Sequence, residues 1–213
     1  MKNLLIVGAR GWGREVYHEI SQTKEVHDGT LCIKGFLDSK YNALEGLKGD
    51  FPPIICAPED YIAQPNDLFF IAMGDPKWRK HYAEMIESKG GHFYTYISPE
   101  AHVIDTAVIG EGSFISLWSS VSDNVRIGKH VILHAFTVLG HDAVVKDYGT
   151  LLNASFLGGG AEVGECSQMS PNSMIIPHKK IGKNVIVGAG SVVMRNVKDG
   201  ISVFGNPAVK LEF

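Results

Sequence analysis

The sequence predicts a fold of two parts, a small α/β domain over residues 1–98 and a parallel β-helix over residues 99–213. Two observations predict the second part. From residue 102 the chain divides into sixteen consecutive hexapeptides without an insertion, and the second residue of all sixteen is Val, Ile, Leu or Met. The first part is predicted from short apolar runs that alternate with segments of helical periodicity.

Each predicted element of the first part rests on a short pattern. Apolar runs over 4–7, 32–37, 68–73 and 92–97 are typical of buried strands. Fourfold spacing predicts one helix with Trp12, Val16 and Ile20 on one face, and a later helix whose apolar face holds Trp78, Tyr82, Met85 and Ile86. This alternation indicates a parallel, Rossmann-like sheet whose ligand crevice lies at the carboxyl ends of its strands.

The turn after the first strand is Gly8-x-x-Gly11-x-Gly13, which differs from the Gly-x-Gly-x-x-Gly fingerprint and therefore disfavours a dehydrogenase. Backbone amides at the start of the following helix can hold an anion such as a diphosphate, and the alternative is a purely structural turn. Asp38 ends the second strand. Its carboxylate is expected either to accept a hydrogen bond from a ribose or base, or to cap the local turn.

The hexapeptides predict short strands that alternate with corners. A period of six does not fit an amphipathic helix, whereas three such sides close a coil of eighteen residues with the aliphatic side chains stacked inside. The third residue is Gly in seven repeats, where we expect backbone angles closed to other residues. The sixth residue is usually small or β-branched.

Composition and charge exclude several classes of partner. A net charge of −3 without a dense Lys/Arg run argues against nucleic acid and membrane surfaces. Cys32, Cys56 and Cys166 lie far apart, which argues against a disulfide framework and fits a reducing cytoplasm. The apolar run 4–7 is too short for a signal peptide and no stretch reaches the length of a membrane span, so we expect a cytoplasmic protein without membrane insertion.

The repeats resemble the hexapeptide-repeat acyltransferase superfamily, and this resemblance alone implies that the coils wind left-handed. The whole chain resembles the bacterial sugar O- and N-acyltransferases that act on sialic acids or nucleotide-linked amino sugars. The resemblance is carried by four marks: the opening Leu-Ile-Val-Gly-Ala-Arg-Gly-Trp-Gly-Arg-Glu-Val, Gly-Phe-Leu-Asp at 35–38, Phe-Ile-Ala-Met-Gly-Asp at 70–75, and Gly-His-Asp at 140–142. The tail segment Phe-Gly-Asn-Pro-Ala at 204–208 looks like the one that follows the helix in these enzymes.

In that family the N-terminal domain holds the nucleotide end of the acceptor. The resemblance therefore implies acceptor-binding roles for Gly8, Gly11, Gly13, Asp38, Ser39, Lys40 and Gly74. It also implies acetyl-CoA as co-substrate, no permanently bound cofactor and no metal. Acetyl-CoA is expected to contact Gly159, Ala189, Gly205, Asn206 and Pro207.

His141 matches the catalytic histidine of the family, and the following Asp142 takes the place of a carboxylate, Glu in some relatives, that orients the imidazole. The chemistry agrees, because a sugar amine or hydroxyl that attacks a thioester must lose a proton and imidazole titrates near neutral pH. His102, His130, His134 and His178 are the competing histidines. Gly159 lies eighteen residues beyond His141, where its backbone amide can stabilise the developing negative charge or simply form a flexible corner.

The sequence thus predicts an acyl-CoA-dependent sugar acyltransferase. N-acetylation of a nucleotide-linked 4-amino-4,6-dideoxy sugar, for surface polysaccharide or glycan biosynthesis, is preferred, and O-acetylation of a sugar such as sialic acid is the alternative. More distant alternatives are a non-catalytic sugar-nucleotide binding protein and a zinc carbonic anhydrase built from His130, His134 and His141. A homotrimer with shared sites is expected, because a single prism would expose Phe114, Trp118 and Phe136.

Overall fold

The computed structural model describes residues 1–211 and separates into two compact units, the first Met1–Tyr94 and the second beginning at Thr95. The expected boundary after residue 98 differs slightly from this division. Strand β6 (Tyr96–Ile97) pairs with β9 (Phe114–Ile115), so it belongs to the second unit. Nothing in residues 1–211 forms a helix both long and apolar enough to cross a bilayer.

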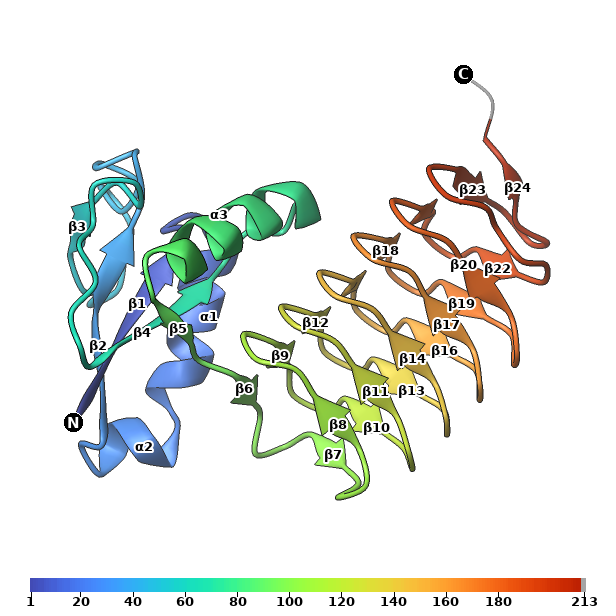
Figure 1. Cartoon of the computed structure of the whole chain (residues 1–213), viewed down its shortest axis with the longest axis horizontal. Coiled ribbons are helices and arrows are strands. Elements are labelled where there is room, and N and C mark those ends of the chain that lie inside the picture. The colour runs from blue at the N-terminus through green and yellow to red at the C-terminus, as the bar shows by residue number, and fades with distance from the viewer. Residues whose placement is uncertain (212–213) are drawn as a thin grey trace. The chain divides into compact units, whose positions relative to one another are not determined.

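The first unit is a parallel sheet with helical connections, as predicted (Figure 1). Its strand order is β3-β2-β1-β4-β5 and all neighbours are parallel. The apolar half of β1 is fully buried, as expected for a central strand. The elements are β1 Lys2–Val7, α1 Gly11–Ser21, α2 Lys24–His27, β2 Leu31–Leu37, β3 Ile54–Cys56, β4 Asp67–Ile71, α3 Pro76–Ser88 and β5 His92–Phe93.

Two sequence expectations for this unit need correction. The single strand expected over 92–97 is two strands, β5 in this sheet and β6 in the β-helix, because the chain changes sheets between them. The expected apolar face of α3 is only partly its buried face: Ile86 is buried as predicted, but it is buried together with Arg79 and Ala83, whereas Trp78 is 54% exposed. The guanidinium of Arg79 donates to the carbonyl oxygens of Met73 and Gly74, at 2.8 and 3.2 Å, so this buried cation holds the connection between β4 and α3.

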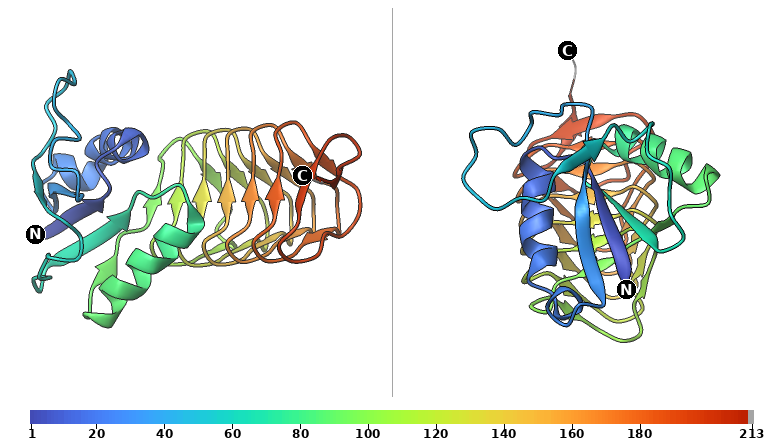
Figure 2. Two further views of the ribbon diagram at one scale, coloured as in Figure 1. Left: turned by 90° about the horizontal axis from the view of Figure 1, so that it is seen from above. Right: turned by 90° about the vertical axis from the view of Figure 1, so that its left-hand side faces the viewer.

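The second unit is a parallel β-helix whose coils stack along one axis (Figure 2). Each of the sixteen hexapeptides contributes one two-residue strand, formed by its first two residues, and each strand from β7 to β19 pairs with the strand eighteen residues further on. We name the three sheets by their first strand. The β7 sheet holds β7 His102–Val103, β10 Ser120–Val121, β13 Val138–Leu139, β16 Phe156–Leu157, β19 Met174–Ile175 and β22 Val192–Val193.

The other two sheets complete the triangular prism. The β8 sheet holds β8 Val108–Ile109, β11 Arg126–Ile127, β14 Val144–Val145, β17 Glu162–Val163 and β20 Lys180–Ile181. The β6 sheet holds β6, β9, β12 Ile132–Leu133, β15 Thr150–Leu151, β18 Gln168–Met169, β21 Ile186–Val187, β23 Ser202–Phe204 and β24 Val209–Lys210. The second-position side chains form the core as predicted, and Leu133, Leu151 and Met169 are fully buried examples.

The corners correct the explanation given for the third-position glycines. Positive φ angles fall at the fifth position of the hexapeptide, where eleven residues other than glycine adopt them, among them Asp142 at 59° and His178 at 61°. The third-position glycines have no positive φ. They are required because consecutive coils approach closely: a Cβ on Gly140 would lie 2.7 Å from the amide nitrogen of Gly159.

Phe114 also departs from expectation, since it is buried rather than exposed. Its ring packs against Tyr96 on the neighbouring strand β6, with ring centroids 4.7 Å apart. Trp118 and Phe136 are exposed as predicted, at 54% and 53%, and their rings contact one another in a tilted arrangement with centroids 4.9 Å apart. The apolar surface of the prism therefore includes an aromatic pair at one corner.

Candidate active site and nucleotide pocket

The His141 corner is one edge of the prism, built from the fourth and fifth residues of four stacked hexapeptides. Its pairs are Asp123–Asn124, His141–Asp142, Gly159–Gly160 and Pro177–His178. Backbone hydrogen bonds tie each coil to the next, because Asp142 N donates to Asp123 O, Gly160 N to His141 O, and His178 N to Gly159 O. Residues that lie eighteen apart in sequence are thereby adjacent along this edge.

His141 and Asp142 form a hydrogen-bonded pair. The His141 Nδ1 atom lies 2.8 Å from Asp142 Oδ2, and the other carboxylate oxygen accepts a 2.6 Å bond from the Asn124 amide of the preceding coil. These bonds, His141 first and Asn124 second, lower the pKa of Asp142. An ionised carboxylate only accepts hydrogen bonds, so Nδ1 carries the proton and Nε2 presents its lone pair.

The Nε2 atom faces the next coil at Gly159. A Cβ added to Gly159 would lie 2.6 Å from Nε2, so no larger residue fits beneath the imidazole in this position. The side chain of His141 is 67% exposed, which leaves it open to a substrate from the solvent side. The arrangement places a proton acceptor and a bare backbone amide side by side.

The amide of Gly159 differs from two amides at the same position of other hexapeptides. Lys129 N and Lys183 N each donate to an aspartate carboxylate of the following coil, Asp147 and Asp199, at 2.9 Å. The coil after Gly159 offers Pro177 at this place, and the part of the chain that the structure describes gives the Gly159 amide no acceptor. The Gly159 amide is therefore left as a backbone donor, whereas the chain's own aspartates occupy the amides of Lys129 and Lys183.

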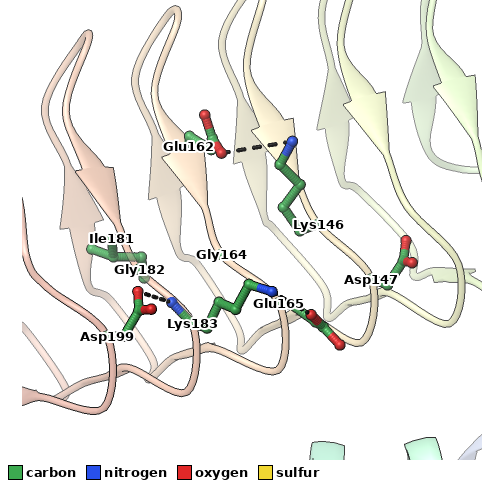
Figure 3. Close-up of a pocket in the computed structure, with 9 residues that line it drawn as sticks. All are labelled: Lys146, Asp147, Glu162, Gly164, Glu165, Ile181, Gly182, Lys183 and Asp199. Atoms are coloured by element: carbon green, nitrogen blue, oxygen red, sulfur yellow. Dashed lines mark hydrogen bonds and ion pairs between the residues drawn. The ribbon is translucent and has the colours of Figure 1, made fainter.

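A hollow of about 440 Å³ lies elsewhere on the prism and is lined mainly by charged residues, several of which pair with one another (Figure 3). Lys183 Nζ lies 3.1 Å from Glu165, and Lys146 Nζ lies 3.7 Å from Glu162. Because these lysine and glutamate side chains are already paired with one another, this hollow is a weaker candidate for the active site than the His141 corner. The volume of a hollow does not by itself identify the active site of this protein.

The residues predicted to bind acetyl-CoA fall into two groups. Gly159 lies at the His141 corner, whereas Ala189 lies at the corner that precedes strand β22. Gly205, Asn206 and Pro207 belong to the second group: Gly205 N donates to Ser191 Oγ at 3.0 Å, and Val192 N donates to Gly205 O at 2.9 Å. Both groups lie beside the β7 sheet, but at the two different corners of the prism that flank it and on different coils.

The histidines of the zinc alternative do not converge within the chain. His130, His134 and His141 lie at three different corners of the prism. The ring of His130 stacks on Tyr148 with centroids 5.3 Å apart. Across residues 1–211, no three His, Cys, Asp or Glu side chains gather as a set of metal ligands.

In the first unit, a cavity of about 360 Å³ lies at the carboxyl ends of the strands, where the crevice was predicted. We call it the strand-end cavity; its lining residues are Gly8, Arg10, Asp38, Ser39, Pro58, Ala72, Met73, Trp78 and Tyr82. Gly8, Asp38 and Ser39 of the predicted acceptor-binding set line it. Lys40, Gly11, Gly13 and Gly74 do not.

Of the two roles that the sequence left open for Asp38, the structure shows the turn-capping one. One carboxylate oxygen accepts from Ala9 N at 2.9 Å and the other from Lys40 N at 2.8 Å, so it ties the glycine turn to the end of β2. Each oxygen retains a further lone pair for a ligand. Arg10 Nε lies 3.8 Å away, which places a cation beside the carboxylate at the cavity.

The structure accounts differently for each of the three glycines of the turn. Gly8 has a φ of 103°, which favours glycine, and a Cβ on Gly13 would collide with the carbonyl of Gly8, so both shape the turn. A Cβ on Gly11 would meet nothing within 4 Å. Gly11 is thus the one whose identity the local packing does not explain.

Comparisons with known proteins agree with this description. Residues 3–86 match the family model of the PglD N-terminal domain. The GDP-perosamine N-acetyltransferase of Escherichia coli O157:H7 is 28% identical over 221 residues, which cover 97% of this chain and 95% of that protein.

Two solved structures share the complete fold. PerB from Caulobacter crescentus, in complex with CoA and GDP-perosamine, has a TM-score of 0.87 and 24% identity over 100% of this chain and 98% of that one. The acetyltransferase domain of PglB from Neisseria gonorrhoeae, in complex with acetyl coenzyme A, has a TM-score of 0.86 and 24% identity over 99% of both chains. They confirm the predicted α/β domain followed by a left-handed β-helix.

The fold is the one that the sequence predicted for a hexapeptide-repeat acyltransferase. Over nearly its whole length the chain is similar to bacterial sugar acyltransferases, and its residues 3–86 match their PglD N-terminal domain. Sequence reasoning missed Arg10, Trp78, Tyr82 and Arg79. Arg10 was visible inside the glycine turn, whereas the helical pattern assigned both aromatic residues to the core.

Proposed function

We propose that this protein transfers an acetyl group from acetyl-CoA to the amino group of a nucleotide-linked 4-amino-4,6-dideoxy sugar. The observation that carries the proposal is the pairing of His141 Nε2, oriented by Asp142, with the open backbone amide of Gly159. A GDP-linked sugar is the first candidate, because the full-length E. coli relative is a GDP-perosamine N-acetyltransferase. Such a product would serve surface polysaccharide or glycan biosynthesis, and the enzyme would act in the cytoplasm.

In the proposed reaction the sugar amine attacks the thioester carbonyl carbon. A C–N bond forms, the carbonyl π electrons move onto oxygen, and the Gly159 amide donates a hydrogen bond to that oxygen. The His141 Nε2 atom takes the proton from nitrogen, and Asp142 stabilises the resulting imidazolium. The C–S bond then breaks and the coenzyme A thiolate receives the proton.

The strand-end cavity supports a nucleotide at the acceptor's far end. Asp38 stands where related α/β folds contact a ribose, and the N-terminus of α1 with Arg10 provides donors for a diphosphate. We propose Gly8, Asp38 and Ser39 as direct contacts. Gly11, Gly13, Lys40 and Gly74 lie outside the cavity lining and remain predicted contacts through their backbone or surroundings.

A homotrimer with shared sites is part of the proposal. The exposed pair Trp118–Phe136 is an apolar surface that a second subunit would cover. Gly159 lies at one of the two prism corners that flank the β7 sheet, and the group formed by Ala189 and residues 205–207 lies at the other. An acetyl-CoA molecule bound between two subunits would contact Gly159 of one subunit and the second group of its neighbour.

The test is a screen of acetyl-CoA with GDP-, dTDP- and UDP-linked 4-amino-4,6-dideoxy sugars, followed by thiol release and mass spectrometry of the product. We expect turnover with at least one amino sugar and a mass increase of one acetyl group on nitrogen. Sialic acid and nucleotide sugars that carry only hydroxyl groups are the matched controls. Turnover restricted to these hydroxyl acceptors would replace N-acetylation with O-acetylation, and no turnover with any acceptor would reject the proposal.

A further inference from the structure

The aromatic wall of the strand-end cavity has no explanation in the packing of the first unit. Trp78 lies on α3, whose buried face is formed by Arg79, Ala83 and Ile86, yet its indole is 54% exposed and lines the cavity. Large aromatic side chains bury a substantial apolar area when they are part of a core. An indole left open beside a cavity is therefore a candidate ligand surface.

The indole is held in place from one side. Tyr82, one turn further along α3, stacks on Trp78 with ring centroids 6.2 Å apart and an interplanar angle of 29°. The Tyr82 hydroxyl donates to Glu59 Oε1 at 3.2 Å, which fixes the supporting ring. His81 contacts the indole edge-on, with centroids 5.7 Å apart at 88°.

The start of α3 is also fixed. The Asp75 side chain accepts a 2.8 Å bond from Lys77 N and caps the helix, and Arg79 anchors the preceding residues through the carbonyl of Met73. The aromatic wall therefore stands on a capped and anchored helix rather than on a loop. Preorganised aromatic surfaces lose little conformational entropy when they bind a flat ligand.

Besides the aromatic rings and the apolar Pro58, Ala72 and Met73, the cavity lining includes charged side chains. Arg10 supplies a cation, and Asp38 supplies a carboxylate with remaining acceptor capacity. A ligand that matches both kinds of wall has a flat aromatic group at one end and hydroxyl and anionic groups at the other. A nucleoside diphosphate has this composition.

We propose that Trp78 is the stacking platform for the base of the nucleotide and gives the site a preference for purines over pyrimidines. The proposal rests on the proposed function, which places the nucleotide end of the acceptor in this cavity. A two-ring purine covers more of an indole than a one-ring pyrimidine does, so removal of the indole costs the purine nucleotide more. Tyr82 acts as a positioning residue behind the platform.

The experiment measures binding of GDP and UDP by calorimetry to the full-length protein, with Trp78→Ala and the conservative Trp78→Phe. We expect Trp78→Ala to weaken GDP binding by about 5- to 100-fold, the usual worth of one stacked base, and UDP binding by a smaller factor. Trp78→Phe should restore most of the GDP affinity. GDP should quench tryptophan fluorescence of the unmodified protein and of Trp118→Phe, but not of Trp78→Phe.

Several outcomes would overturn the proposal. If Trp78→Ala leaves GDP binding unchanged, the base lies elsewhere, and if GDP and UDP weaken by the same factor, Trp78 only shapes the cavity. If the unmodified protein binds neither nucleotide, the acceptor assignment and this proposal fail together. GDP binding with the expected Trp78 dependence but without acetyl transfer would support the platform and reject only the proposed reaction.

Discussion

The imidazole of His141 lies directly against Gly159 of the next coil, so that a Cβ at residue 159 would come within 2.6 Å of Nε2. Gly159→Ala should therefore displace the imidazole and obstruct the proposed oxyanion donor. We expect kcat to fall by about 10²- to 10³-fold, the range for loss of one oxyanion donor, with the thermal midpoint little changed. Steady-state kinetics and a melting curve check this, and full activity in Gly159→Ala would remove Gly159 from the site.

His141→Ala should lower kcat by about 10²- to 10⁴-fold while both substrates still bind, because the variant loses the proton acceptor. An amine acceptor that is already neutral would bring the loss toward the lower bound. His134→Ala is the matched control, since His134 lies at another corner of the same prism. Retention of kcat in His141→Ala together with its loss in His134→Ala would move the base to His134.

Asp142→Asn should reduce kcat less than His141→Ala does, because it disturbs orientation without removing the base. Hydrogen bonds from His141 and Asn124 lower the pKa of Asp142, so this carboxylate is ionised at neutral pH. Its favourable contribution is present above its unfolded pKa of about 3.9 and is lost as pH falls through the lowered folded pKa.

Asn124→Ala is the matched control for Asp142→Asn, because it removes the 2.6 Å hydrogen bond to the carboxylate and leaves the carboxylate in place. Steady-state kinetics should therefore show a smaller loss of kcat in Asn124→Ala than in Asp142→Asn. An unchanged kcat in Asp142→Asn would show that Asp142 does not act on His141.

Asp38→Ala should raise the KM of the nucleotide-sugar acceptor more than that of acetyl-CoA. Loss of a hydrogen bond to a charged group predicts an increase of about 10- to 150-fold in the acceptor KM. Because Asp38 also binds Ala9 N and Lys40 N, Asp38→Asn is the control that preserves part of the turn. Equal changes in both KM values would identify the carboxylate as scaffolding.

Light scattering should give three times the chain mass of 23.2 kDa at micromolar concentration. Replacing the exposed pair by Trp118→Asp and Phe136→Asp should shift the protein toward monomer, because two charges would be buried in the proposed interface. Activity should fall with the trimer if sites are shared. A monomeric unmodified protein would reject both the trimer and the shared site.

The parts of the structure that repeat were predictable from sequence. The second position of the hexapeptide is Val, Ile, Leu or Met in sixteen consecutive repeats, which predicts a ladder of buried side chains. The pairing of His141 with Asp142 was also expected from the family motif. The third-position glycines were correctly found but wrongly explained, because the close approach of Gly140 to the following coil is a contact eighteen residues distant.

The strand-end cavity was harder to predict because several of its walls come from residues that a periodic pattern assigns elsewhere. Trp78 and Tyr82 fit an apolar helical face, and only the burial of Arg79 and Ala83 beside Ile86 shows that α3 is rotated from the predicted orientation. A buried arginine gives no sequence signal unless its carbonyl partners are known. The short strand β3, with only three residues, likewise gives no periodic signal.

The uninterrupted stacking of β13, β16, β19 and β22 has a geometric consequence. These strands separate the coil of His141 from the coil beside Gly205 by three inter-strand steps, about 14 Å along the prism axis at the usual spacing of parallel strands. Each coil of eighteen residues thus adds one fixed step to the length of the β-helix. Insertion or deletion of a whole coil between these points would change the distance between the two proposed acetyl-CoA contacts by about 5 Å, while His141 and Asp142 kept their places.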